Sequence, residues 1–172
     1  MRPPVETILA PPFPRGLPWV NVAPLRMDQQ AGRPVLVEFW DFCRPQSLRT
    51  LPYVRAWHER YAAAGLRVIS VHCPGFAPGR NEDAVRAAVA RLGIEHAVCI
   101  DADFQVWRAY DNEGWPARYL FDGAGRLAVE HPGAHLLIEH PLSTAGVLAL
   151  EVGDGVECLC VCFTPGVAPP GT

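Results

Sequence analysis

One cysteine stands at a position where protein chains commonly do chemistry. Cys43 lies in a short polar turn, residues 41–47, between an apolar run that ends at Trp40 and a segment with helical periodicity. A thiol just before a helix meets the positive end of the helix dipole, and Arg44 adds a cation beside it. Because both effects favour the thiolate, the sequence predicts a Cys43 more acidic than an average cysteine and able to form a mixed disulfide.

A second cysteine is a candidate partner for the first. Cys73 ends another apolar run, residues 66–73, and the helical segment between the two runs makes their strands parallel. Parallel neighbours finish at the same edge of a sheet, so Cys43 and Cys73 can approach, although a disulfide needs Cα atoms within about 7 Å. Cys73 is therefore a possible resolving thiol, and the alternative is a buried residue at a strand end.

Other polar residues carry weaker signals. His72 beside Cys73 is interpreted as a hydrogen-bonded strand residue rather than a metal ligand. Three further cysteines alternate along one face of an expected strand, where neighbouring sulfurs lie roughly 7 Å apart, too far to close on one metal ion. They are Cys158, Cys160 and Cys162. We therefore expect no metal and no cofactor.

Composition limits the class of protein. The chain has 172 residues, 49% hydrophobic and 19% charged, which favours a globular chain with one main core over a disordered one. A net charge of −3, without a basic run interleaved with aromatics, argues against a nucleic-acid partner. Prolines interrupt the first 16 residues where a signal peptide needs an apolar run, so we expect a cytoplasmic protein with no membrane partner.

Strands and helices are expected to alternate along the chain. Expected strands cover residues 17–22, 35–40, 66–73, 97–100, 117–121 and 126–130, and expected helices cover 45–64, 103–110 and a segment capped by Asn81 and stopped by Gly93. The Asp122-Gly123-Ala124-Gly125 run predicts a hairpin between antiparallel strands. Pro52 is expected to kink the first helix.

Three parts follow from this pattern. Residues 1–30 are rich in proline and are expected to lie extended on the surface, residues 31–133 form the α/β domain, and residues 134–172 form a C-terminal extension. The extension alternates like a strand at 156–163 and is interpreted as β-rich, with the start of a truncated second domain as one interpretation.

Two motifs carry a resemblance to a known family. The segment FWDFCRPQSLRTLPY, residues 39–53, resembles the active-site stretch of TlpA- and DipZ-type thioredoxin-like proteins and of NHL-repeat-associated thioredoxin domains. The segment WPARYLFDGAGRL, residues 115–127, is similar to their cis-proline loop and following hairpin. The resemblance spans about residues 15–131 and implies a thioredoxin-like α/β fold, with a central mixed sheet flanked by helices and redoxin-type thiol–disulfide chemistry.

The chain departs from this family at the reactive positions. When the segment is matched to the family, the positions of the two redox cysteines are occupied by Arg44 and Ser47, so the Cys-x-x-Cys motif is degenerate. Cys43 stands one residue before the first of these positions. A shift of one residue would instead place Cys43 at the first redox position and Gln46 at the second.

The resemblance also implies a peptide-binding groove. Pro116 is expected to follow a cis peptide bond and to face the turn, with Trp115, Trp40 and Ser47 lining the groove. Two functions stay open. The first is thiol–disulfide exchange through Cys43 with protein or small-molecule thiols and disulfides, and the second is a non-catalytic binding or scaffold module that uses the same groove.

Overall fold

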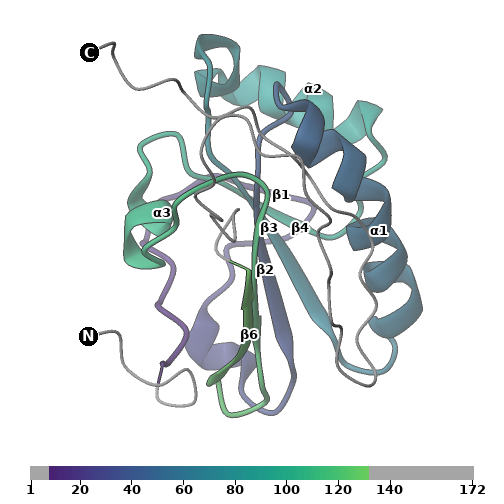
Figure 1. Cartoon of the computed structure of the whole chain (residues 1–172), viewed down its shortest axis with the longest axis vertical. Coiled ribbons are helices and arrows are strands. Elements are labelled where there is room, and N and C mark those ends of the chain that lie inside the picture. The colour runs from purple at the N-terminus through teal and green to yellow at the C-terminus, as the bar shows by residue number, and fades with distance from the viewer. Residues whose placement is uncertain (1–7, 132–172) are drawn as a thin grey trace, which may run out of the picture. The chain divides into compact units, whose positions relative to one another are not determined.

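The computed structural model describes residues 8–131 and confirms the α/β class with a mixed sheet flanked by helices (Figure 1). The strands are β1 (Trp19–Val20), β2 (Val35–Trp40), β3 (Arg67–His72), β4 (Ala97–Ile100), β5 (Ala117–Phe121) and β6 (Leu127–His131), in the spatial order β1-β4-β3-β2-β5-β6. The three central strands, β2 to β4, run parallel, while β1 and β5 are antiparallel to their neighbours and β6 is antiparallel to β5. The expected edge strand and hairpin are thus present.

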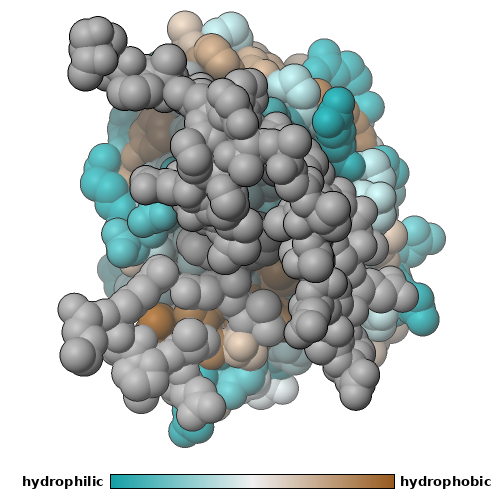
Figure 2. Space-filling view, in the orientation of Figure 1, coloured by the Kyte–Doolittle hydropathy of each residue, from teal (hydrophilic) through white to brown (hydrophobic). Residues whose placement is uncertain are grey.

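Helices cover both faces of this sheet. They are α1 (Pro45–Tyr61), α2 (Glu82–Arg91) and α3 (Gln105–Ala109), with short 3-10 turns η2 (Met27–Gln30) and η3 (Ala77–Arg80). In Figure 1, α1 and α2 lie on one side of the sheet and α3 on the other. Figure 2 shows hydrophilic side chains along the outer edge where α1 lies. Pro52 lies inside α1. As predicted, Asn81 caps α2 by accepting the Ala84 N–H at 3.0 Å.

The period of two in β2 sends alternate side chains to different cores. Val37 and Phe39 join the cluster on the α3 side, where the Phe39 ring meets those of Trp107, Tyr110 and Tyr119 at centroid distances of 5.5–5.8 Å. Trp40 points to the other face and packs with residues of α1 and α2. The strand is buried along its whole length, so the turn that follows it starts from a rigid base.

The proline-rich segment before β2 was expected to lie on the surface, but it also contributes side chains to the core. Phe13 and Trp19 are each only 8% exposed and pack edge to face at 5.2 Å. Ala10 N–H donates to Gly125 O at 2.9 Å, which ties the segment to the hairpin turn. Because α3 is short, this face of the sheet needs the segment's aromatic rings to complete its core.

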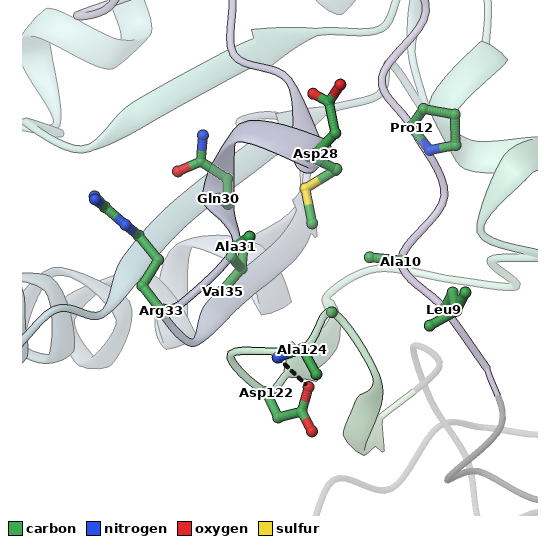
Figure 3. Close-up of a pocket in the computed structure, with 12 residues that line it drawn as sticks. Leu9, Ala10, Pro12, Asp28, Gln30, Ala31, Arg33, Val35, Asp122 and Ala124 are labelled. Carbon is green, nitrogen blue, oxygen red and sulfur yellow. Dashed lines mark hydrogen bonds between the residues drawn. The ribbon is translucent and has the colours of Figure 1, made fainter.

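A pocket of about 270 Å³ lies between this segment, η2 and the hairpin turn (Figure 3). Its lining includes Leu9, Met27, Arg33 and Asp122. Val35, at the first residue of β2, also lines it, whereas Cys43 follows the last residue of that strand. β2 has six residues, so its two ends lie roughly 20 Å apart. This pocket is therefore not the site of Cys43.

A polar cluster is buried between the sheet and α1. Glu38 accepts from Arg118 Nη2 at 2.9 Å and from Ser70 Oγ at 3.4 Å, and Ser70 Oγ lies 2.7 Å from His96 Nε2. Burial raises the pKa of Glu38, against the opposing charge of Arg118. Burial also lowers the pKa of His96 to about 3, helped by the nearby His58 and Arg55.

This cluster makes folding stability depend on pH. Folded His96 stays neutral down to about pH 3, whereas the unfolded chain binds a proton near pH 6.5, so stability is lost as pH falls between these values. We expect His96 to account for a loss of about 2 kcal/mol between pH 6.5 and pH 5. Urea unfolding of wild type and of His96→Gln at both pH values measures this loss of stability. Equal pH dependence in the two proteins would contradict this expectation.

Candidate functional site

The turn between β2 and α1 is organised by one buried carboxylate. Asp41 is 0% exposed, and its Oδ1 accepts the Cys43 N–H at 2.9 Å while its Oδ2 accepts the Gly75 N–H at 2.9 Å. Its own N–H donates to Ser47 Oγ at 3.2 Å in the first turn of α1. Asp41 therefore ties the turn both to α1 and to the loop that follows β3.

His72 lies against this carboxylate. Its Nε2 is 3.5 Å from Asp41 Oδ1, its ring stacks on Phe42 at 5.3 Å, and neither ring nitrogen has a hydrogen-bond partner within residues 8–131. Burial opposes ionisation of Asp41, but the approach of His72 and the two backbone N–H groups outweigh it and hold the pKa of that carboxyl below its ordinary value. Asp41 is therefore ionised at neutral pH.

Cys43 is a half-buried free thiol beside this charge. Burial raises the pKa of Cys43, and the charge and hydrogen-bonding contact of Asp41 raise it further. The sequence-based expectation of an unusually acidic thiol is therefore wrong in direction. That expectation considered the helix dipole and Arg44, but not the buried carboxylate of Asp41 two residues before the cysteine.

Arg44 joins the turn to the proline loop. Its Cζ lies 4.1 Å from the centroid of the Trp115 ring and 5.3 Å from that of Phe76. A Cβ at Gly75 would stand 2.7 Å from Arg44 Nε, so a side chain there would require the guanidinium to shift. The Trp115–Pro116 bond is cis, the isomer that the resemblance implied, and Trp115 Nε1 donates to Cys73 O at 3.1 Å.

Cys73 lies inside the protein. It is 0% exposed, its Sγ contacts Asp101 Oδ2 at 3.4 Å, and it packs in the cluster on the α3 side. Burial raises the pKa of this thiol well above its ordinary value, and the charge of Asp101 adds to the effect. Cys43 and Cys73 are both free, so the two possible partners form no disulfide in this structure, and Cys73 has the buried strand-end position given as the alternative.

Two residues expected in a groove are buried instead. Trp40 is 1% exposed because its position in β2 points it under α1 and α2. Ser47 is also 1% exposed, with its hydroxyl engaged by the Asp41 N–H. Of the three expected groove residues, only Trp115 is partly exposed. The surface of the site is therefore made by Cys43, Arg44 and Trp115.

The role of Asp41 in the turn was not predicted from the sequence, and neither were its contacts with His72 and Gly75. The signal for Asp41 was present, because an aspartate that bonds the backbone two residues on is a common turn. The contact with His72 had a weaker signal, namely that both residues follow or end neighbouring parallel strands. No local pattern indicated Gly75.

Several sequence-based predictions lie outside the described residues. They concern Cys158, Cys160, Cys162 and the extension from residue 134 onward. Within residues 8–131, no helix has the length and apolar character needed to cross a membrane. The cytoplasmic location stays a prediction.

Fold and site together define a class of protein. A mixed sheet with a strand–turn–helix unit facing a cis-proline loop makes this a thioredoxin-like protein. A crystal structure of a putative thiol:disulfide interchange protein DsbE from Chlorobium tepidum has the same fold, with a TM-score of 0.64 and 23% identity over 74% of this chain and 85% of that one. No protein-family model matches the chain.

Sequence relatives refine this class. Protein DipZ of Mycobacterium tuberculosis is 34% identical over 112 residues, which cover 63% of this chain but only 16% of DipZ. Thiol-disulfide oxidoreductase YkuV of Bacillus subtilis is 27% identical over 109 residues, 63% of this chain and 73% of YkuV. The chain has the thioredoxin-like fold, and DipZ and the thiol-disulfide oxidoreductase YkuV are among its homologues.

Proposed function

We propose that this protein exchanges thiols and disulfides through one cysteine, Cys43. The observation that carries the proposal is access: among the cysteines within residues 8–131, Cys73 and Cys99 are buried, and Cys43 alone is partly exposed. It lies in the turn that Arg44 joins to the loop of Trp115 and Pro116. Homologues that are thiol-disulfide oxidoreductases support the same chemistry.

The reaction begins at one sulfur, that of Cys43, and is completed by a thiol from another molecule. Cys43 Sγ attacks one sulfur of the partner's disulfide, a new S–S bond forms, and the leaving sulfur takes up the proton that Cys43 loses. Ser47, at the position of the second family cysteine in the resemblance, cannot resolve this mixed disulfide. A second molecule of thiol must therefore attack it and restore the Cys43 thiol. Burial, together with the charge of Asp41, raises the pKa of Cys43 and keeps the thiol protonated, which makes the first step slow at neutral pH.

A non-catalytic binding module is the second candidate. The raised pKa of Cys43 favours it, because a protonated thiol is a weak nucleophile. In this alternative, the partly exposed Trp115 and the adjoining Pro116 loop would bind a partner without turnover.

An exchange assay separates the two functions. Bis(2-hydroxyethyl) disulfide is the substrate, glutathione is the outside thiol, and wild type is compared with Cys43→Ser. We expect the exchange rate of wild type to exceed that of the variant by about tenfold, since Cys43 is the one partly exposed cysteine within residues 8–131. Equal rates from two folded proteins would contradict the exchange function and favour the binding module.

A further inference from the structure

Arg44 has a guanidinium without hydrogen bonds. No residue between 8 and 131 accepts from any of its nitrogens, and its Nε is buried without a partner. The nearest anion is Asp41, whose Oδ2 lies 3.8 Å from that Nε, which is too long for a hydrogen bond. Each Asp41 oxygen already accepts a backbone N–H. The two Nη nitrogens of Arg44, which are not buried as Nε is, are therefore available to another group.

The same guanidinium is held in place. Trp115 lies against it with the ring centroid at 4.1 Å and Phe76 with the centroid at 5.3 Å, and the guanidinium also lies close to the backbone of Gly75. Its side chain remains 32% exposed, so part of the group faces solvent. A planar cation fixed on an aromatic face, with free donors, suits bidentate recognition of a carboxylate.

The position of Arg44 places any bound anion beside Cys43. Arg44 is the residue before α1, a helix of 17 residues that has no side-chain cap at its N-terminus. The positive end of the helix dipole and the guanidinium therefore favour a negative group at the same place.

We infer that Arg44 is a specificity residue that selects disulfides carrying a carboxylate close to the reacting sulfur. This inference rests on the proposed exchange at Cys43 and names its substrate class. During the step described above, the carboxylate binds Arg44 while the neighbouring sulfur bonds to Cys43 Sγ. A small acid and an acidic peptide both present a carboxylate close to a disulfide sulfur.

Three disulfides that differ in charge test the inference. The rate of mixed-disulfide formation at Cys43 is measured with dithiodipropionate, which is anionic, bis(2-hydroxyethyl) disulfide, which is neutral, and cystamine, which is cationic. Oxidised peptides Asp-Cys and Asn-Cys with amidated C-termini, which differ only in the side-chain carboxylate, distinguish a peptide source from a small acid. We expect wild type to favour the anionic compound over the neutral one by about tenfold, less at high salt.

Matched variants assign the preference to one arginine. Arg44→Gln is expected to remove the preference and Arg44→Lys to keep part of it, while Arg49→Gln, an exposed arginine of α1, is expected to keep it whole. A preference that survives Arg44→Gln, or rates independent of charge, would overturn the inference and leave exchange at Cys43 intact.

A binding measurement keeps the inference separate from the exchange reaction. In Cys43→Ser, titration with dithiodipropionate is followed by the indole N–H resonance of Trp115. We expect the resonance to shift, and to stay still when Arg44→Gln is added. A shift together with no reaction of wild type would contradict the exchange function and retain the anion site. No shift at millimolar dithiodipropionate would refute that site.

Discussion

Arg44→Cys and Ser47→Cys together are expected to turn this protein into a dithiol reductant that reduces insulin, an activity expected to be undetectable in wild type. The two positions are the residue before α1 and the third residue of that helix, so they face each other across one helical turn. Residues three apart on a helix have Cβ atoms about 5–6 Å apart, and a small adjustment allows a disulfide. Ser47 is 1% exposed, which suits a protected second thiol.

Single variants provide the control for this gain of activity. Arg44→Cys alone and Ser47→Cys alone are expected to remain inactive with insulin, because neither completes the pair. Mass spectrometry before and after reduction shows whether the double variant forms its internal disulfide. If the folded double variant forms no such bond and reduces no insulin, the assignment of the family's redox positions to these two residues is wrong.

Asp41→Asn is expected to raise the alkylation rate of Cys43 by iodoacetamide at pH 7.5 by about tenfold. Asp41 raises the pKa of the thiol through its charge and through a hydrogen-bonding contact, so the neutral amide lowers that pKa and increases the thiolate fraction. The rate is followed against pH on the peptide that contains Cys43, and its midpoint should move to lower pH.

The same change should weaken the fold. Asp41 accepts two backbone N–H groups, and an asparagine presents a donor to one of them, at a cost of about 1–3 kcal/mol. Asp83→Asn is the control, because Asp83 is exposed in the first turn of α2. If the pH profile of Cys43 were the same in Asp41→Asn and in wild type, the account of its acidity would be wrong.

Most of the fold could be predicted because its signals are local. β4 and β5 have the predicted bounds, since each is a short apolar or alternating run between turn residues. The hairpin followed from its glycine-rich turn. The core role of Phe13 could not be predicted, because proline content describes the local backbone and not what the segment packs against.

The site was harder to predict because its contacts are distant in sequence. The direction of the Arg44 side chain is decided by Trp115 and Gly75, neither of which is its neighbour in the chain. Because Arg44 is adjacent to Cys43 in the sequence, its charge was expected to act on the thiol, whereas burial and Asp41 determine the direction of the Cys43 pKa shift. The burial of Trp40 could have been foreseen, since it shares a sheet face with Leu36 and Glu38.

Peptide mapping after incubation with bis(2-hydroxyethyl) disulfide tests most directly whether Cys43 is the reacting thiol. In the folded wild-type protein, we expect the mercaptoethanol adduct on the Cys43 peptide and none on the peptides of Cys73 and Cys99, which are buried. An unmodified Cys43, or an adduct of equal extent on Cys73, would contradict single-cysteine exchange at this site.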